Sequence, residues 1–333
     1  MSLEKIANLA GVSATTVSVA LRNGPGVNSA TRERIVRIAR DLGYAPNAAA
    51  SSLACGKARL IGVAPYTVSE GCHIGPCAAA IIDGLSDSVH ERGMDVVLIS
   101  DEGQTGVPRL LSQRAVGGVM ISSFPHPRLL EWLKATSLPC VGVNLGLVSD
   151  MDCVHSDSAG GVHQAIEHLA ALGHRRIAYI NTDIPPGRHH APTAGMRLHG
   201  FLTTVAERGL IASPGSEIHC DVRERISALF ANGHSPTAFM CYNDDIAMVA
   251  VQALAERGLR VGPEVSVVGI DDNGSAELTN PPLATVHVPF AEMGRRGGEL
   301  LLSRIDEPER PLESIELPET LVIRKSTGPA PRN

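Results

Sequence analysis

Polar side chains stand directly after apolar runs of the sequence, where they could hold a small molecule. Asp271 follows the run Ser266–Ile270, and Asn243 follows the run Ala238–Cys241. Arg197 begins a helical stretch. A guanidinium beside a carboxylate can bind a hydroxyl or carboxylate group through paired hydrogen bonds. We therefore expect Arg197, Asn243 and Asp271 to belong to a ligand-binding site.

Asp244 lies next to Asn243 but has a more ordinary explanation. It starts the helical stretch Asp244–Arg257, and an aspartate at that position commonly caps a helix. We expect this capping role for Asp244. Asp271 is different, because it opens a row of three polar residues after a fully apolar strand, and we expect it to contact the ligand.

Thiol and imidazole groups gather in two segments, residues 71–77 and 181–193. Such groups could bind a metal or respond to oxidation, but their spacing matches no common zinc pattern. We expect no metal site and place these residues in loops near the mouth of the ligand site. The residues are Cys72, His73, Cys77, His189 and His190.

Signatures of common enzyme sites are missing from the sequence. It has no P-loop, and Gly24-Pro25-Gly26 lacks the strand that precedes a dinucleotide-binding loop. It also has no Gly-x-Ser-x-Gly elbow and no evident pairing of a nucleophile with a base. We expect no catalytic residues, no cofactor and no enzymatic activity, although an enzyme built on the same fold remains an alternative.

Three short helices are predicted at the start of the chain. Apolar residues recur at helical spacing from Leu3 to Ala10, and Gly11 ends the pattern. Ser13 can cap a second helix, Ala14–Leu21, and Asn28 can cap a third helix that begins near Ser29 and stops at Gly43. Two short helices joined by a tight turn and followed by a third are typical of a helix-turn-helix unit.

The second helix of such a unit enters the major groove of DNA. Its hydroxyl groups can bond phosphates or bases, and its small apolar side chains can meet a thymine methyl group. The alternative is that the same residues form a solvated helix face. The candidate DNA contacts in this region are Ser13, Ala14, Thr15, Thr16, Ser18, Val19 and Asn28.

The charge distribution favours the DNA-binding interpretation. Residues 1–60 hold eight basic and three acidic side chains, a net charge of +5. The whole chain has a net charge of −6, which leaves −11 for the other 273 residues. A basic start on an acidic body indicates a polyanionic partner for the first segment only.

The segment after the third helix reads as a linker. Pro46 interrupts the chain, and an Ala-rich stretch, residues 47–54, ends before Gly56. Eight residues do not form a stable isolated helix in water. We expect a segment that folds only when a partner holds it.

Residues 3–63 resemble the headpiece and hinge of the lactose-repressor family of bacterial regulators. The run Ala-Gly-Val-Ser-x-x-Thr-Val-Ser at 10–18 and the run Gly-Tyr-x-Pro-Asn at 43–47 carry the resemblance, which extends over nearly the whole chain. It implies that Leu53 is the hinge leucine that wedges into the minor groove, where an apolar wedge unstacks a base step and bends the duplex. The other hinge residues implied at the DNA are Asn47, Ala50 and Ala54.

Two positions depart from the family pattern. Val19 stands where many relatives carry a base-reading polar or basic residue, and Ser51 stands where an arginine is common. The operator sequence therefore cannot be taken from a relative.

Beyond Leu60 the pattern alternates between strands and helices, which predicts parallel sheets flanked by helices. The resemblance implies two doubly wound parallel-sheet subdomains, as in periplasmic binding proteins, with a small molecule in the cleft between them. We expect a headpiece at 1–45, a hinge at 46–57 and a core at 58–333. The first subdomain would span about 58–157 plus 289–317, and the second about 158–288 plus 318–333.

The resemblance also implies that Arg197, Asn243 and Asp271 bind the effector, and we add Thr193 and His73 from the flanking loops. The effector would be a sugar or a related metabolite. The His- and Pro-rich loop at 181–193 and the replacement of an aromatic-rich opening at 71–77 argue against a standard pyranose pocket.

Composition agrees with a folded regulator. Apolar residues make up 44% of the chain, no run of about 18 apolar residues predicts a membrane span, and the start is no signal peptide. Seven scattered cysteines indicate reduced thiols. We expect a cytoplasmic, nucleoid-associated homodimeric repressor that binds a pseudo-palindromic operator in double-stranded DNA and a small-molecule effector. A transport solute-binding protein is the alternative.

Overall fold

The computed structural model describes residues 3–21, 24–44, 59–64, 75–99, 107–113, 115–122, 127–145, 150–181, 192–213, 221–231 and 235–331. The chain divides into two compact units, Met1–Ala58 and Arg59–Asn333. None of the described helices combines the length and apolarity that crossing a membrane requires.

The first unit is a three-helix bundle of α1 (Leu3–Ala10), α2 (Ala14–Leu21) and α3 (Ser29–Asp41). Its small core forms because each helix buries one apolar stripe, and Ile6, Val17 and Ile35 are fully or almost fully buried at its centre. The expected three helices are confirmed, with the same start and end of the second.

The second unit contains two six-stranded sheets among its described residues. In the first sheet the strands follow the order β11-β5-β4-β3-β1-β2, and every neighbouring pair is parallel. Its strands are β1 (Leu60–Ala64), β2 (Asp95–Leu98), β3 (Gly118–Ser122), β4 (Cys140–Val143), β5 (Asp152–Ser156) and β11 (Ser314–Leu317).

The second sheet has the order β12-β10-β9-β8-β6-β7. It is parallel except at one edge, where β12 runs antiparallel to β10. Its strands are β6 (Arg176–Ile180), β7 (Ile211–Ala212), β8 (Ala238–Cys241), β9 (Ser266–Asp271), β10 (Ala284–His287) and β12 (Thr320–Val322).

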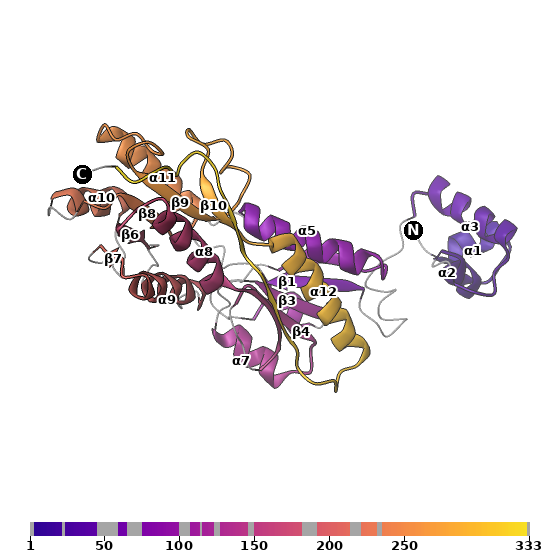
Figure 1. Cartoon of the computed structure of the whole chain (residues 1–333). Coiled ribbons are helices and arrows are strands. Elements are labelled where there is room, and N and C mark those ends of the chain that lie inside the picture. The colour runs from indigo at the N-terminus through magenta and orange to yellow at the C-terminus, as the bar shows by residue number, and fades with distance from the viewer. Residues whose placement is uncertain are drawn as a thin grey trace. The chain divides into compact units, whose positions relative to one another are not determined.

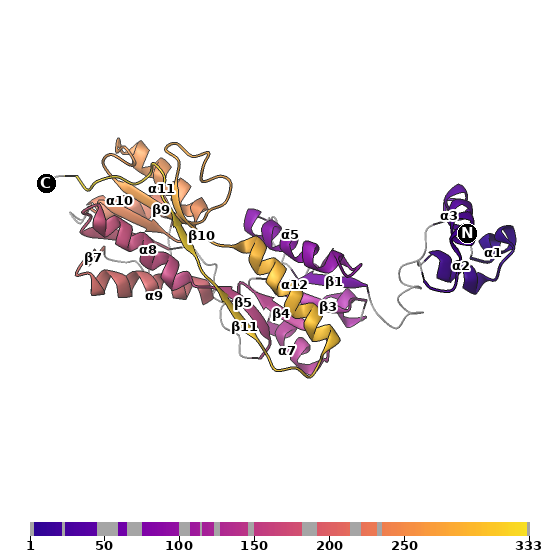
Figure 2. The same cartoon turned by 45° about the vertical axis from the view of Figure 1, so that its right-hand side comes forward.

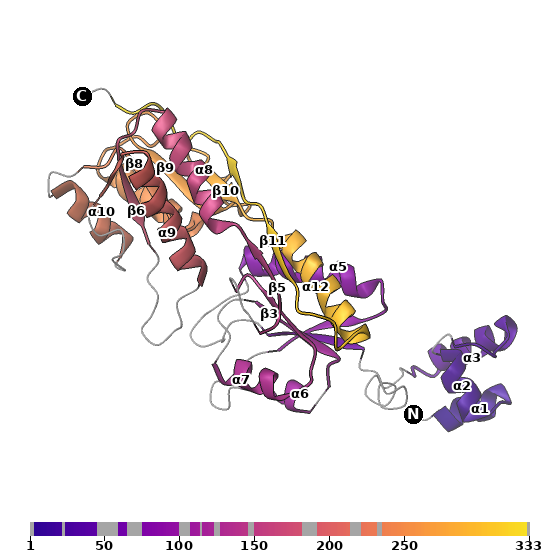
Figure 3. The same ribbon diagram turned by 60° about the horizontal axis from the view of Figure 1, so that its bottom comes forward.

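Helices cover both faces of each sheet (Figure 1). On the first sheet, α5 (Pro76–His90) and α12 (Phe290–Asp306) lie on one face, and α6 (Arg109–Ser112) and α7 (Pro127–Ala135) lie on the other, as Figure 3 shows. On the second sheet, α8 (Ser158–Ala171) and α9 (Pro192–Glu207) lie opposite α10 (Val222–Ala231) and α11 (Asp244–Glu256). This is the doubly wound α/β core that the sequence predicts.

The chain passes between the two sheets three times. It crosses between Ser156 of β5 and Ser158 of α8, between β10 and α12, and between Leu317 of β11 and Thr320 of β12. The last crossing appears in Figure 2 as one nearly continuous strand that joins the edges of both sheets. The three short crossings form a narrow waist. The two halves of the core can move relative to one another about this waist.

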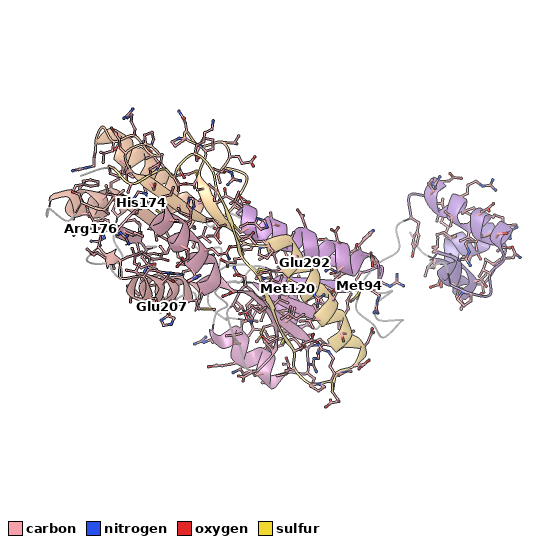
Figure 4. The ribbon with its side chains drawn as sticks, in the orientation of Figure 1. Met94, Met120, His174, Arg176, Glu207 and Glu292 are labelled. Carbon is pink, nitrogen blue, oxygen red and sulfur yellow. The ribbon has the colours of Figure 1, made fainter. Side chains whose placement is uncertain are left out.

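Helices α5 and α12 approach each other so closely that backbone meets backbone. A Cβ atom on Gly84 would lie 1.9 Å from the carbonyl oxygen of Ala291, and one on Gly294 would lie 2.0 Å from that of Ile81. On its other side α12 packs on β3, where Met120 lies beneath it (Figure 4). The helix pair and the first sheet therefore form one rigid layer.

Several elements were not among those expected from the sequence, including α7, α12, β5, β10, β11 and β12. Strand β5 is fully buried although it contains Asp152, because Arg304 and Arg310 each donate to that carboxylate at 2.9 Å. His155 also lies in this strand. His168 lies in α8, and His174, labelled in Figure 4, directly follows the turn at 172–173.

Candidate functional site

Helix α2 presents the candidate DNA contacts at its start. Its N-terminus is fixed by Ser13, whose Oγ accepts from the Thr16 backbone N–H at 3.1 Å and lies 2.8 Å from the Thr16 hydroxyl. Thr15 is exposed, whereas Thr16, Ser18 and Val19 are half-buried. Capping by Ser13 confirms the predicted role of that residue within the fold.

Ala14 and Val19 are less available than the sequence indicates. Ala14 is half-buried and packs against the headpiece core. The carbonyl oxygen of Val19 accepts from the Gly24 N–H at 2.9 Å, so the end of α2 is tied to the following loop. The exposed hydroxyl of Thr15 is therefore the most accessible candidate on this helix.

Arg32 holds the loop between α2 and α3 from within. Its guanidinium donates to the carbonyl oxygens of Ala20 at 3.1 Å, Gly24 at 2.7 Å and Val27 at 3.2 Å. A guanidinium with three carbonyl partners stabilises the turn. Arg32 thus contributes its charge to the basic headpiece, but its donors are used within the fold.

Asn28 caps α3, because its Oδ1 accepts from the Thr31 N–H at 2.8 Å. The side chain is exposed, so its amide nitrogen stays accessible for a phosphate. The predicted hinge contacts lie outside the described residues; they are Asn47, Ala50, Leu53 and Ala54.

In the core, Arg197 and Asp271 come together as expected. Arg197, in the second turn of α9, is 4% exposed. Its Nη2 donates to Asp271 Oδ1 at 3.3 Å and its Nη1 to the carbonyl oxygen of Tyr242 at 2.8 Å, while the guanidinium lies 4.9 Å from the Tyr242 ring centre. The Nε of Arg197 is buried and has no hydrogen-bond partner among the described residues.

The carboxylate of Asp271 stands on a strained backbone. Asp271 ends β9 with a φ of 116° and Asp272 follows with a φ of 54°. Such conformations are rare for residues other than glycine and cluster at functional sites. Asp272 is held in turn by Arg324 at 2.8 Å and His287 at 3.1 Å.

Asn243, and not Asp244, has the helix-capping role that we expected of Asp244. Asn243 is the helix cap, since its Oδ1 accepts from the Ile246 N–H at 2.9 Å. Asp244 is fully buried, and it accepts from the Thr285 hydroxyl at 2.5 Å and from the Asn273 N–H at 3.0 Å. The capping interpretation of Asp244 was therefore wrong, and the residue instead fixes the loop that carries Asp271. The amide nitrogen of Asn243 is the part left for a ligand.

Burial sets the protonation of these acids. It raises the pKa of Asp244 to about 7, the hydrogen bond from Thr285 opposes this, and the charge of Asp271 adds to it. Burial also raises the pKa of Asp271, against the lowering effect of Arg197. The pKa of Arg197 is itself raised: burial lowers it, but the charges of Asp271, Tyr242, Glu319 and Tyr179 together outweigh that effect.

The remaining effector candidates are divided by the structure. Thr193 is buried at the start of α9, on the same helix as Arg197. His73 lies outside the described residues, and so do Cys72, His189 and His190. Within the described part of the chain, no three His, Cys, Asp or Glu side chains are grouped so as to hold a metal ion.

Cys77 brings the first half of the core to this site. It lies on α5, and burial, followed by the nearby charge of Asp271, raises the pKa of its thiol. A thiol that stays protonated is a poor nucleophile and a poor metal ligand. Cys77 lines the cavity at this point beside Asp271.

A cavity of about 400 Å³ separates the two halves at this point. The start of α5 and the first turn of α12, including the labelled Glu292 (Figure 4), line one side. Residues 271–274 and 287–288 line the other. A volume of this size suits a small metabolite.

Tyr242, Thr285 and Glu319 were not expected at the site. Tyr242 could have been suspected, since it follows an apolar strand directly before Asn243. Thr285 and Glu319 carry no such signal, because Thr285 lies in β10 and Glu319 lies between β11 and β12, and the sequence did not predict these strands.

The chain was compared with known proteins. Residues 2–47 match the model described as bacterial regulatory proteins, lacI family, and residues 166–327 match a periplasmic binding protein-like domain. The HTH-type transcriptional repressor PurR of Mannheimia succiniciproducens is 31% identical over 337 residues, and that of Haemophilus influenzae is 30% identical over 339. Each alignment covers 98% of both chains.

The chain belongs to the LacI family. Solved structures agree: the lac repressor dimer bound to operator and the anti-inducer ONPF has a TM-score of 0.80 at 28% identity, covering 98% of this chain and 99% of that one. The complex of the regulator CelR with cellobiose has a TM-score of 0.71 at 28% identity, with the same coverage. This LacI-family chain is a DNA-binding transcriptional repressor with an effector-binding core, not an enzyme.

Proposed function

We propose that this repressor senses a hydroxyl-bearing metabolite, a sugar or a close relative, through Arg197 and Asp271. The observation that carries the proposal is the buried pair of Arg197 and Asp271, in which Asp271 stands on a strained strand end beside the junction of the two halves. A guanidinium donates and a carboxylate accepts, so together they match a hydroxyl group, which does both. The lac repressor and CelR neighbours, the latter bound to cellobiose, support the same ligand class.

Asn243, Thr193 and His73 complete the proposed effector site. The amide nitrogen of Asn243 would donate to the ligand while its oxygen caps α11. Closure of the cleft on the effector would change the spacing of the two halves and so order or release the hinge at 46–57. By thermodynamic reciprocity, operator DNA must change effector affinity by the same factor.

At the DNA, we propose that each headpiece reads one half of a pseudo-palindromic operator. Thr15, Thr16, Ser18 and Val19 would face the major groove, Ser13, Ala14 and Asn28 would flank it, and Leu53 would wedge into the minor groove between Asn47, Ala50 and Ala54. The protein would act in the cytoplasm, on the nucleoid. We retain the boundaries 1–45, 46–57 and 58–333 as the proposed division of labour.

The effector assignment is tested by thermal unfolding of the full chain with sugars, polyols, nucleosides and small acids. A ligand at about 100 times its Kd adds about 2.7 kcal/mol of stability, enough to raise Tm by several degrees. We expect such a shift from a hydroxyl-bearing compound, and we expect Arg197→Gln to abolish it. Arg208→Gln, an exposed arginine that follows the same helix, is the matched control. A shift that survives Arg197→Gln would overturn the assignment.

The wedge is tested separately. Leu53→Ala should weaken operator binding by at least about tenfold, since it removes the apolar group that holds the kinked step. The shift in Tm caused by the effector should be unchanged. Equal operator affinity of the two proteins would show that Leu53 has another role.

A further inference from the structure

Glu319 is a buried carboxylate at the waist of the core. It lies in the link between β11 and β12, which is the third crossing between the sheets, and it is 1% exposed. Its Oε1 accepts from the hydroxyl of Ser156 at 2.7 Å and from that of Ser158 at 3.0 Å. These two serines flank the first crossing. One carboxylate oxygen therefore ties two of the three crossings together.

The start of α8 is fitted closely around this side chain. A Cβ on Gly161 would lie 2.3 Å from Glu319 Oε2, so only glycine leaves room for the carboxylate there. Gln164, one turn further on, donates to the Glu319 carbonyl oxygen at 2.9 Å and accepts from the Leu321 N–H at 3.1 Å. The positive end of the helix dipole favours a negative charge at this place. Glu319 cannot move without moving the start of α8.

The second oxygen of the carboxylate has no hydrogen-bond partner among the described residues. A buried, unsatisfied carboxylate oxygen is costly, and native proteins satisfy such atoms with a ligand or an ordered water. Other buried groups in the described part of the core share this condition, and the Nε of Arg197 and the hydroxyl of Tyr179 are among them. Glu319, Arg197 and Tyr179 thus offer one acceptor, one donor and one group that is both.

The charges of neighbouring groups, Glu319 among them, shift the pKa values of Arg197 and Asp271. Burial lowers the pKa of Arg197, and the charges of Asp271, Tyr242, Glu319 and Tyr179 raise it, in that order of importance. Glu319 also adds to the burial that raises the pKa of Asp271. The acid that holds the crossings is thus within electrostatic reach of the proposed effector clamp. A hydroxyl group or a water molecule can accept from a guanidinium N–H and donate to a carboxylate at the same time.

We propose that Glu319 is a positioning residue that couples the Arg197–Asp271 ion pair to the first and third crossings between the sheets. Its Oε1 holds Ser156 and Ser158, and its Oε2 takes a proton donor shared with Arg197, either an effector hydroxyl or a water molecule in its place. The proposal rests on the effector role of Arg197. Replacing the water by an effector hydroxyl changes what Oε2 is bonded to, and the carboxylate passes that change to both crossings.

The test changes Arg197 and measures amide exchange at the first and third crossings, with neither effector nor DNA added. Amide hydrogen exchange of the full chain is followed at residues 157–161 and 318–321 by mass spectrometry. We expect Arg197→Gln to speed exchange there by about twofold or more, because the interaction between two coupled neighbouring residues changes an equilibrium by at least that factor. In a Glu319→Gln background the same substitution should have no further effect. Glu319→Gln keeps the shape of the side chain and one accepting oxygen.

Two further variants keep the result interpretable. Glu316→Gln removes an exposed charge from the neighbouring strand β11, and the effect of Arg197→Gln should persist in it. Ser156→Ala combined with Ser158→Ala removes both hydrogen bonds from these serines to Glu319 Oε1. The effect of Arg197→Gln on exchange at 157–161 should then vanish. An equal effect of Arg197→Gln with and without Glu319, or no effect in the wild type, would overturn the proposal. Either result would leave the effector assignment standing, since thermal shifts measure that independently.

Discussion

At the scale of single residues, the effector site depends on charges that the fold has buried. Arg197 is 4% exposed and Asp244 is fully buried, so each needs partners that the sequence does not display. Arg197 finds Asp271 and the Tyr242 carbonyl, and Asp244 finds the Thr285 hydroxyl and the Asn273 N–H. The site is built by these pairings before any ligand arrives.

Asp244 should make the stability of the core depend on pH. Its pKa is raised to about 7 in the folded protein, far above that of the unfolded chain. Between these values the folded state binds a proton that the unfolded state has lost, so stability falls as pH rises from about 4 to about 7 and is level above. The slope can reach about 1.4 kcal/mol per pH unit. Urea unfolding of the wild type and of Asp244→Asn at pH 5, 6, 7 and 8 measures it.

The difference between these two proteins should shrink or reverse toward pH 8, because the asparagine cannot be ionised. Asp245→Asn, at the adjacent exposed position, should follow the wild type at every pH. A constant difference between wild type and Asp244→Asn would show that Asp244 is ionised throughout.

Residue types alone indicated Arg197 and Asp271, because a polar residue after an apolar strand is conspicuous. They did not separate Asn243 from Asp244, since both side chains can cap a helix and only backbone geometry decides which of them does. The role of Glu319 was not predicted, because nothing in the sequence Leu317-Pro318-Glu319-Thr320 indicates that the glutamate is buried.

At the scale of elements, helices α5 and α12 pack against each other on one face of the first sheet. Glycine at 84 and 294 permits the close approach of these helices. Alanine at 84 would place its Cβ 1.9 Å from the Ala291 carbonyl oxygen, which the backbone cannot avoid without separating the helices. We expect Gly84→Ala to lower the free energy of unfolding by about 2 kcal/mol or more.

Chemical denaturation of the full chain checks this value. Gly195→Ala is the matched control, because that helical glycine has no atom within 4 Å of an added Cβ. It should be neutral or slightly stabilising, as alanine is the better helix former. Similar losses in both variants would refute the close-approach argument.

The headpiece has its own test in Arg32. Arg32→Ala removes three hydrogen bonds to carbonyl oxygens of the α2–α3 loop. We expect a loss of about 1–3 kcal/mol in headpiece stability, measured as its melting by circular dichroism at high and low salt. Arg34→Ala, on the exposed face of α3, should leave the melting unchanged. A loss that disappears in high salt would mean that Arg32 acts through charge alone.

At the scale of the whole molecule, alternation of strands and helices was enough to predict a doubly wound core behind a helix-turn-helix unit. In each sheet, one edge strand and its neighbour were not predictable in the same way. Strands β5, β10, β11 and β12 are short and carry charged or polar residues that become acceptable only in contact with distant parts of the chain, as Asp152 does with Arg304. The three crossings between the sheets lie directly beside these strands, so the side chains that meet there can be identified only from the fold.

The most direct test of the account is selection of DNA from a random duplex pool by the purified full chain at a stated salt concentration. A dimer with one headpiece per half-site should enrich a pseudo-palindrome, bound about a thousandfold or more tighter than bulk DNA. Sedimentation should give two chains per enriched duplex, and deletion of residues 1–57 should abolish enrichment. Recovery of no preferred sequence, or of a single asymmetric half-site bound by one chain, would contradict the account.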